Sequence, residues 1–591
     1  MYDHIGQMIK ESVKQNADHT AVKFKKNSRW ESLTYTEFGK MIDTLACALI
    51  NAGVNPGDNI GIYSANRYEW AVTDFACAIA GAVSVPIYAT NTKEQAEFII
   101  KDAKIRLVFT GNEFQYKNIE KIVSQGRPLK LISYDHAIDT DPEFAHSFRK
   151  FITIENQAKF SKEISKRLAQ IKKHDTTTII YTSGTTGNPK GVMLTHANLF
   201  HQCMAVDKNF TISSRDVSLC FLPLSHVYER MWSYFVFFKG ATHTYLEDPK
   251  KIIETLKEVK PTAMVSVPRL YEKIFAAVMN AQENASSLKK TLFQRALITG
   301  KKYAYAKKNR LPISLGLKLR HKFFDKIVLK KIRDVVGGEK NFFSAGGAPL
   351  EQSIEEFFFA CGILICQGYG LTETSPMISY NTPDAFKFGT VGKPVPGCRV
   401  KIAENGEILV KGPQVMKGYY NNPEKTSQAI VDGWFRTGDV GEFDSDGFLK
   451  ITDRIKDIII TSGGKNIAPQ RIETLIGKDF FIEQIVTIAD KRKFVSALVV
   501  PSFEALETWA AKKQIPFGSR DELVSHPEVI QFFAKRIEIH SKTLARYETI
   551  KKFRLISEPF TVEGGEITPT LKLKRKNINE KYKDLIDSIY N

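Results

Sequence analysis

A strand–helix–strand alternation near the N-terminus constrains the fold of this chain most. A short apolar run covers 59–63, a helical stretch with one apolar face covers 67–80, and a β-branched run covers 82–87. Two strands joined in this way usually pair in parallel within a sheet that has helices on both faces. Further apolar runs of strand length recur at 105–110, 176–182, 263–267 and 363–367. The sequence therefore predicts an α/β fold built on doubly wound parallel sheets.

The character of the sequence changes after about Asp439. Short strand-like runs and glycine turns follow, and an α+β pattern with strands near 484–489 and 494–500 continues to the end. A boundary near 453–456 would divide the chain into a large N-terminal domain, 1–453, and a small α+β domain, 454–591. The length of 591 residues and the hydrophobic content of 43% are sufficient for a core in each domain.

Cysteine usage and the N-terminal sequence favour a cytoplasmic protein. The seven cysteines are odd in number and form no C-x-x-C pair, which favours reduced, buried thiols over disulfides or a zinc site. The N-terminus lacks the apolar core of a signal peptide, and no apolar run approaches the ~20 residues that span a bilayer. We expect a soluble protein that is at most peripheral at the inner face of a membrane.

Positive charge is concentrated in one segment. Residues 286–333 carry fifteen Lys or Arg and a single acid, Asp325, so this segment holds +14 against +19 for the whole chain. It also carries leucines and phenylalanines at helical spacing, and a basic amphipathic segment can lie on anionic lipid. A basic face that is simply solvated explains the same charge, and this alternative stays open. Nucleic acid is disfavoured as a partner because no aromatic-interleaved readout motif accompanies the charge.

The segment 177–191 has the composition of a phosphate-binding loop. A β-branched strand runs into a turn rich in hydroxyls and glycines, before a helix that Thr195 can cap. The candidate ligands of the phosphates are Thr182, Ser183, Gly184, Thr185, Thr186, Gly187 and Lys190. Glycines let the backbone close around an anion, while the hydroxyls and the lysine supply donors and charge. The spacing is not that of a Walker A loop, because Gly191 follows Lys190 where that motif needs Ser or Thr.

This loop resembles the signature loop of the adenylate-forming superfamily, which includes acyl-CoA synthetases, luciferases and peptide-synthetase adenylation domains. Four further stretches match in the family's order, namely QGYGLTETSP at 367–376, GWFRTGD at 433–439, DRIKDIIITSGGKNIAP at 453–469 and ITPTLKLKRK at 567–576. FLPLSHVYER at 221–230 is most similar to the long-chain fatty acyl-CoA synthetases. The resemblance implies that ATP and a fatty acid, of long chain by this last motif, form an acyl-adenylate and pyrophosphate. CoA then displaces AMP.

The resemblance also assigns residues to the adenosine half of ATP. They are Gly346, Gly347, Ala348 and Tyr369 for adenine, and Asp439 and Arg454 for ribose, with Gly370 as a further ATP-binding residue. Tyr369 would stack on the adenine ring. A carboxylate such as that of Asp439 accepts hydrogen bonds from two hydroxyls, and Arg454 keeps its charge at any relevant pH.

Three further residues are implied for the reacting groups. Thr372 corresponds to a phosphate contact and Glu373 to the ligand of Mg²⁺, which prefers carboxylate and phosphate oxygens. His226 corresponds to a residue near the acyl carboxylate. The resemblance thus implies Mg²⁺ as the metal. We expect positioning and electrostatic stabilisation to supply most of the catalysis of adenylate formation.

The catalytic lysine of the family matches Lys572. Its ammonium could bridge the attacking carboxylate and the α-phosphate. The family usually has Gly before this lysine, whereas here it is Leu571, so Lys574 remains an alternative.

The resemblance makes the small domain a mobile lid. Lys456 corresponds to the hinge about which it rotates between the two half-reactions. Ser462, Gly463, Gly464 and Lys465 correspond to the loop that lines the CoA channel.

Two other functions stay open. An acyl-AMP ligase would make the same adenylate but pass the acyl group to a carrier protein. A non-catalytic lipid-surface protein would use the basic segment alone and would not consume ATP. Neither acyl chain length nor oligomeric state follows from the sequence.

Overall fold

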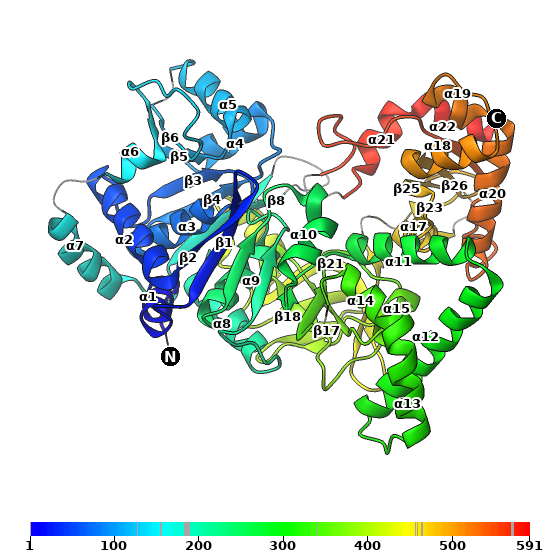
Figure 1. Cartoon of the computed structure of the whole chain (residues 1–591). Coiled ribbons are helices and arrows are strands. Elements are labelled where there is room, and N and C mark those ends of the chain that lie inside the picture. The colour runs from blue at the N-terminus through cyan, green and yellow to red at the C-terminus, as the bar shows by residue number, and fades with distance from the viewer. Residues whose placement is uncertain are drawn as a thin grey trace.

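The structure consists of two large mixed sheets, a smaller antiparallel sheet and a C-terminal α+β unit (Figure 1). This computed structural model describes residues 2–126, 128–153, 157–182, 189–338, 340–455, 457, 459–462, 465–568 and 572–591. All seven cysteines lie in these ranges and are free thiols, as predicted.

The first large sheet has eight strands with a parallel centre. In spatial order they are β19 (Gly418–Tyr419), β9 (Lys190–Thr195), β8 (Thr176–Thr182), β4 (Val83–Ile87), β3 (Asn59–Tyr63), β5 (Leu107–Thr110), β6 (Lys130–Ser133) and β7 (Ala145–Ser147). Strands β8 through β7 pair in parallel, and β9 and β19 add antiparallel pairs at one edge. Helix α3 (Tyr68–Ala80) connects β3 to β4, so the predicted strand–helix–strand unit is confirmed.

The second large sheet has nine strands. In spatial order they are β16 (Lys393–Pro394), β15 (Met377–Tyr380), β14 (Ile365–Gly370), β13 (Phe342–Ala345), β12 (Ala263–Met264), β10 (Val217–Cys220), β11 (Thr242–Tyr245), β1 (Thr20–Lys26) and β2 (Arg29–Thr34). The strands from β14 to β1 pair in parallel and the outer pairs are antiparallel. The runs at 263–267 and 363–367 contribute β12 and β14, as predicted.

The two large sheets share one hydrophobic core. Twelve of the thirteen residues of α3 are buried, as expected of a helix that is apolar all round and lies between layers. Ile62 of β3 and Leu219 of β10 belong to the same core cluster, so the cluster reaches both sheets. The other helices of this part are α1 (Ile5–Gln15), α2 (Tyr35–Asn51), α4 (Lys93–Asp102), α5 (Glu113–Val123), α6 (Phe148–Ile152), α7 (Gln157–Gln170), α8 (His196–Asp207), α9 (Val227–Phe238), α10 (Ile252–Val259), α14 (Lys330–Val335) and α15 (Gln352–Ala360).

A five-stranded antiparallel sheet follows. Its strands are β17 (Arg399–Ile402), β18 (Glu407–Lys411), β20 (Ile430–Val431), β21 (Trp434–Phe443) and β22 (Leu449–Arg454), with α16 (Pro423–Ala429) before β20. The antiparallel strands therefore begin at Arg399. The sequence pattern places this change near Asp439, and that prediction is wrong. The β21–β22 hairpin, with Phe443 opposite Leu449, is the short-strand region that the pattern does predict.

The C-terminal unit has a three-stranded sheet and its own cores. Strands β25 (Ile482–Ile488), β26 (Ser496–Pro501) and β27 (Lys552–Leu555) follow the small hairpin of β23 (Ile459–Ile460) and β24 (Asn466–Ile467). The helices are α17 (Pro469–Gly477), α18 (Phe503–Lys512), α19 (Arg520–Ser525), α20 (Pro527–Ser541), α21 (Arg575–Lys581) and α22 (Lys583–Tyr590). Its apolar side chains form two clusters that are separate from the core of the large sheets. The two predicted strands at 484–489 and 494–500 are confirmed as β25 and β26.

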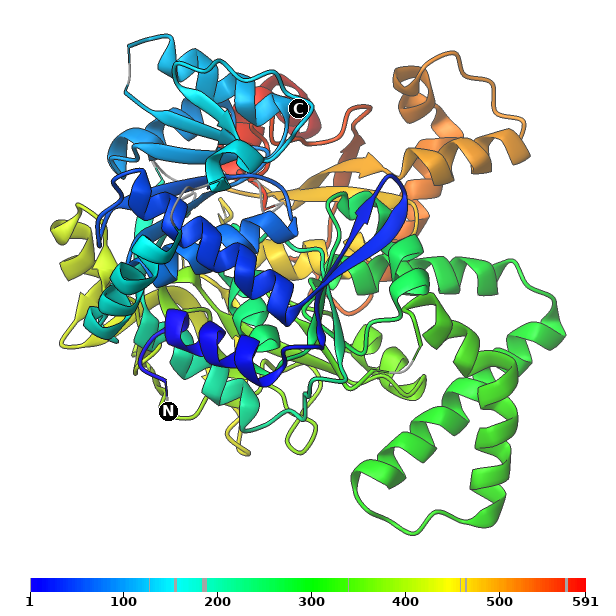
Figure 2. The ribbon, with the colours of Figure 1, turned by 60° about the vertical axis from the view of Figure 1, so that its left-hand side comes forward.

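A pair of helices projects from the large domain. After α11 (Pro268–Glu283), the chain forms α12 (Ser287–Lys308) and α13 (Leu315–Phe324), which stand out from the rest of the molecule (Figure 2). Together with the π-helical turn at Asp325–Leu329 and the start of α14, they hold most of the basic segment 286–333. Within the described ranges, no helix combines the length and the apolar character needed to cross a membrane.

Candidate active site

One cavity of about 580 Å³ brings together most of the predicted site residues. It lies beyond the carboxyl ends of β13 and β14, where open α/β sheets usually bind ligands. The predicted residues that line it are Thr182, Lys190, His226, Gly346, Gly347, Tyr369, Gly370, Thr372, Glu373, Asp439, Arg454 and Lys572. These come from both large sheets, the antiparallel sheet and the C-terminal unit.

Other predicted residues are not placed in this cavity. Ala348, Ser462 and Lys465 belong to the described chain but do not line it. The Lys465 Nζ atom lies 5.9 Å from the ring centroid of Tyr547. Ser183, Gly184, Thr185, Thr186, Gly187, Lys456, Gly463 and Gly464 lie outside the described residues. The roles that the sequence suggests for all these positions stay predictions.

The two ends of the phosphate loop meet at the cavity. Strands β8 and β9 pair antiparallel with Thr182 opposite Lys190, so both residues lie at the same end of the sheet. The Lys190 Nζ atom is 4.8 Å from the ring centroid of Tyr419, which also lines the cavity. Thr195 caps α8 as predicted, because its hydroxyl accepts the backbone N–H of Asn198.

A carboxylate with two partners forms one wall. Asp439 is only 3% exposed. Its Oδ2 accepts the Tyr369 hydroxyl at 2.6 Å, and its Oδ1 pairs with the Arg454 Nε at 2.8 Å. Burial, followed by the Asp439 charge, raises the pKa of Tyr369, so its phenol stays protonated and remains a donor. Three of the residues predicted to contact adenosine, Tyr369, Asp439 and Arg454, are thus joined in one hydrogen-bonded set.

Glycines allow close backbone packing on the predicted adenine side. A Cβ atom at Gly346 would lie 3.1 Å from the ring of Tyr228, whose hydroxyl is 2.6 Å from the Ser344 Oγ. A Cβ atom at Gly370 would lie 1.7 Å from the carbonyl oxygen of Pro376. A larger residue at Gly370 would therefore displace the turn that carries Thr372 and Glu373.

Hard oxygen donors occupy this turn. Thr372 and Glu373 begin a short 3-10 turn after β14, and both line the cavity. The Tyr419 hydroxyl donates to the Glu373 Oε1 at 2.9 Å, and the backbone carbonyl of Glu373 accepts the N–H of Met416 at 2.8 Å. A fixed carboxylate beside a hydroxyl suits Mg²⁺, which prefers oxygen ligands and completes its shell with phosphate and water.

His226 is the N-cap residue of α9, and its imidazole is neutral. Its Nδ1 accepts the backbone N–H of Tyr228 at 3.2 Å, so the imidazole caps this helix. Burial, and then the nearby Lys572 ammonium, lower the pKa of His226 to about 4. Because Nδ1 is an acceptor, the proton of the neutral ring is on Nε2, which can donate a hydrogen bond.

A short hairpin carries Lys572 to the cavity. The backbone carbonyl of Lys572 accepts the N–H of Thr568 at 2.8 Å, and the carbonyl of Glu566 accepts the N–H of Lys574 at 2.7 Å. Desolvation, and then the Arg454 guanidinium, lower the pKa of Lys572, while the Asp439 and Glu373 charges oppose this shift. Lys574 directly precedes α21 and does not line the cavity. The geometry therefore favours Lys572 over Lys574.

Comparison with known proteins shows the family of the chain. The model of the AMP-binding enzyme family matches residues 9–420, and that of the AMP-binding enzyme C-terminal domain matches residues 456–591. The chain belongs to the AMP-binding enzyme family. The predicted resemblance to the adenylate-forming superfamily is thus confirmed.

Relatives of this AMP-binding enzyme cover nearly the whole chain. A protein of Mycobacterium bovis named long-chain-fatty-acid–CoA ligase FadD15 is 36% identical over 100% of this chain and 97% of its own length. The peroxisomal long chain acyl-CoA synthetase 6 of Arabidopsis thaliana is 33% identical over 94% of this chain and 81% of its own.

Solved structures confirm the predicted α/β fold. An anthranilate CoA ligase in complex with anthranoyl-AMP has a TM-score of 0.72 at 20% identity, over 99% of this chain and 98% of its own. An O-succinylbenzoate CoA synthetase of Bacillus subtilis, solved with ATP and a magnesium ion, has a TM-score of 0.66 at 22% identity, over 96% and 98%.

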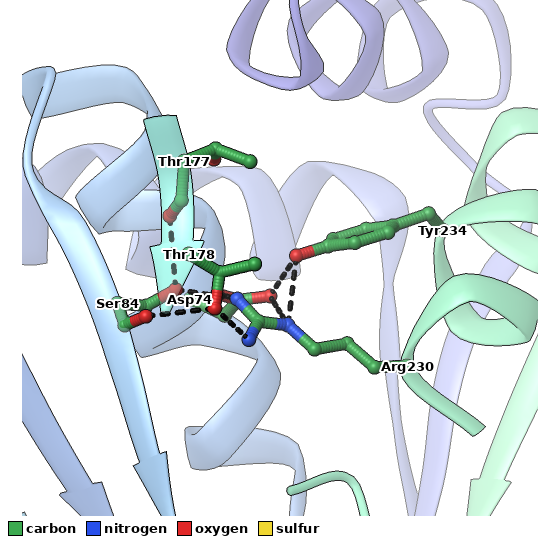
Figure 3. A network of polar contacts seen from close by, with 6 residues as sticks. All are labelled: Asp74, Ser84, Thr177, Thr178, Arg230 and Tyr234. Carbon is green, nitrogen blue, oxygen red and sulfur yellow. Dashed lines mark hydrogen bonds and ion pairs between the residues drawn. The ribbon is translucent and has the colours of Figure 1, made fainter. Parts of the chain in front are cut away.

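Arg230 is a buried residue to which the sequence analysis assigns no role, and it connects elements around the site of this AMP-binding enzyme. Arg230 follows His226 by one turn on α9, and its guanidinium reaches Asp74 of α3 and Thr178 of β8, the latter at 2.6 Å (Figure 3). Tyr234 donates to the same Asp74 carboxylate at 2.6 Å. The helix that carries His226 is thereby tied to the strand that leads into the phosphate loop.

The sequence also leaves the apolar end of the cavity unassigned. This end is lined by Val206, Phe210, Met231, Trp232, Phe342 and Tyr380. The rings of Trp232 and Phe342 stack with centroids 4.9 Å apart, and Phe210 meets Phe342 edge-on at 4.6 Å. In the sequence, the apolar run that begins at Met231 is a local indication of an apolar pocket. The same run is equally typical of a helix buried in the hydrophobic core.

Proposed function

We propose that this chain is an ATP-dependent fatty acid–CoA ligase that acts on long-chain acids. It converts ATP and the acid to acyl-adenylate and pyrophosphate, and CoA then displaces AMP to give the thioester. The observation that carries the proposal is that Lys572, from the C-terminal unit, lies in one cavity with Glu373 and the Asp439–Arg454 pair. An apolar end lined by Trp232 and Phe342 continues this cavity and suits an alkyl chain.

Each residue has a positioning or electrostatic task in this reaction. Asp439 and Arg454 hold the ribose, with Tyr369 beside the adenine. His226 donates from Nε2 to the acyl carboxylate. The Lys572 ammonium lies between that carboxylate and the α-phosphate and lowers the repulsion between two anions as the new P–O bond forms.

Magnesium accompanies the ATP in this proposal. Glu373 and Thr372 are the oxygen donors that would hold it, and when bound it neutralises charge on the phosphates. The Tyr419 hydrogen bond keeps the Glu373 carboxylate directed at the same part of the cavity.

Thioester formation requires a second orientation of the C-terminal unit. We assign the hinge to Lys456, and the CoA channel to Ser462, Gly463, Gly464 and Lys465. Ser462 and Lys465 do not line the present cavity, as expected if they serve the later half-reaction.

The partners are a fatty acid, ATP and CoA. Long-chain acids partition into bilayers, so we propose that this cytoplasmic enzyme meets its substrate as a peripheral protein at an anionic membrane, through 286–333.

Pyrophosphate release across a panel of acids from C2 to C20, with and without CoA, tests the proposed ligase. We expect release to rise toward long chains, with AMP and acyl-CoA formed in equal amounts when CoA is present. An acyl-AMP ligase would make adenylate without CoA-dependent release of the acyl group. A lipid-surface protein would consume no ATP with any acid, and either result would contradict the proposal.

A further inference from the structure

Helix α13 carries an apolar stripe that nothing in the described chain covers. Leu315, Leu319 and Phe323 follow one another at intervals of one helical turn and are 72%, 60% and 57% exposed. No residue of α13 is buried. Six of the fourteen large hydrophobic side chains that are exposed in the described chain lie between 288 and 323. Such a concentration usually marks a surface that meets a partner.

Basic side chains flank this stripe. With about 100° of rotation per residue, Lys318 and Lys322 project beside one edge of the stripe and Arg320 beside the other. All three are exposed. Elsewhere in the segment, Lys301 pairs with Glu356 at 2.6 Å and Arg333 with Asp325 at 2.7 Å, so part of the charge serves the fold. The charge beside the α13 stripe faces solvent instead.

The place of α13 in the molecule leaves this face accessible. Tyr303 of α12 stacks on His321 of α13 with ring centroids 3.8 Å apart, which fixes the hairpin from its inner side. The hairpin projects beyond the body, so the outer face of α13 can meet a flat surface before the rest of the molecule does (Figures 1 and 2).

We propose that the outer face of α13 docks on an anionic lipid bilayer, with Leu315, Leu319 and Phe323 inserted at the interface and Lys318, Arg320 and Lys322 at the headgroups. A row of leucine and phenylalanine beside lysines with long alkyl stems suits this interface. A nucleic acid or an acidic protein would pair with the basic side chains, but it would not explain the row of exposed apolar side chains beside them. The inference deepens the membrane contact included in the proposed function, although binding itself needs no catalysis.

Vesicle sedimentation of the full-length protein, without ATP, CoA or fatty acid, tests this inference. We expect at least tenfold tighter binding to vesicles with about 30 mol% phosphatidylserine than to pure phosphatidylcholine, and release at about 0.5 M salt. The triple variant Leu315→Ser, Leu319→Ser, Phe323→Ser should bind at least tenfold more weakly, as should Lys318→Gln with Lys322→Gln. These side chains are exposed, so we expect both variants to fold and to keep pyrophosphate release with a water-soluble acid.

A matched control uses exposed apolar residues elsewhere. Phe114→Ser, Ile530→Ser and Ile539→Ser replace side chains that are 52%, 42% and 58% exposed, and together they should leave vesicle binding unchanged. Equal binding to neutral and anionic vesicles, wild-type binding by either α13 variant, or stronger binding to an RNA or an acidic protein would overturn the inference. Vesicle binding by protein that releases no pyrophosphate with any acid would contradict the ligase and support the docking surface.

Discussion

Lys572 is the residue on which the proposed chemistry depends most. It is the lysine of the C-terminal hairpin that lines the cavity, and it lies near enough to Arg454, Asp439 and Glu373 for each of them to affect its pKa. We propose that its ammonium stabilises charge that develops during adenylation and not during attack by CoA.

Replacing Lys572 by Ala should therefore separate the two half-reactions. We expect pyrophosphate release to fall by about 10²–10³-fold, the usual effect of removing one group that stabilises the transition state. Thioester formation from supplied acyl-adenylate should change by less than about threefold. Lys574→Ala is the matched control and should stay near wild type, because Lys574 lies outside the cavity and its side chain makes no capping hydrogen bond to α21. Equal losses in both half-reactions would refute this role.

Residues with ligand chemistry in a local motif are predictable from sequence, whereas contacts made by distant packing are not. Glu373, Asp439 and Arg454 are singled out because the motifs that contain them resemble those of the adenylate-forming superfamily. The Tyr419–Glu373 hydrogen bond spans 46 positions and the Arg230–Asp74 pair spans 156. No periodicity or spacing reveals such pairs.

Among the elements, α11 fixes the orientation in which Lys572 reaches the cavity. The Arg269 Nη2 atom donates to the backbone carbonyl of Glu483 at 2.7 Å, and its guanidinium lies 3.1 Å from the Glu483 carboxylate. Lys273, one turn along α11, lies 3.0 Å from the same carboxylate. Arg269 and Lys273 belong to the large domain and Glu483 to the C-terminal unit, so these contacts join the two.

Removing this connection should slow adenylation selectively. The variant Arg269→Ala with Lys273→Ala loses charged hydrogen bonds worth about 1–2 kcal/mol, so we expect adenylation to slow by about 5–30-fold. Thioester formation from supplied adenylate should stay the same or rise, since the second orientation becomes easier to reach. Lys10→Ala breaks an exposed pair with Asp43 at 2.7 Å within the large domain and should change neither rate. Equal losses of adenylation and of thioester formation in the double variant would show that these α11 contacts serve stability alone.

Elements with continuous apolar runs are also the ones that the sequence predicts well. The apolar strands of the parallel sheets are buried on both faces, and this makes their runs visible, as at β4, where every residue is buried. The antiparallel sheet from Arg399 escapes prediction because its strands lack such continuous buried runs, as at β17, where exposed and half-buried residues alternate. Register shifts at Glu407/Leu409 and Val440/Gly441 also interrupt the alternation of side chains.

At the scale of the whole molecule, the C-terminal unit supplies the lysine and the large domain supplies the remaining contacts. The C-terminal unit has hydrophobic clusters of its own, and the division into two domains near the end of β22 stays a prediction. Their mutual orientation is not predictable from composition or motifs, because the contacts that join them, such as that of Arg269 with Glu483, link residues far apart in the sequence.

The identity of the nucleotide product tests the central claim that a carboxylate attacks the innermost phosphorus of ATP in this cavity. Purified protein would be given ATP labelled on the adenine, a long-chain acid, Mg²⁺ and CoA, and the nucleotides would be separated by chromatography. We predict AMP in a one-to-one ratio with pyrophosphate and acyl-CoA, and no ADP. Formation of ADP and inorganic phosphate instead would mean attack at the outermost phosphorus, which would contradict the proposed roles of Lys572 and Glu373 together.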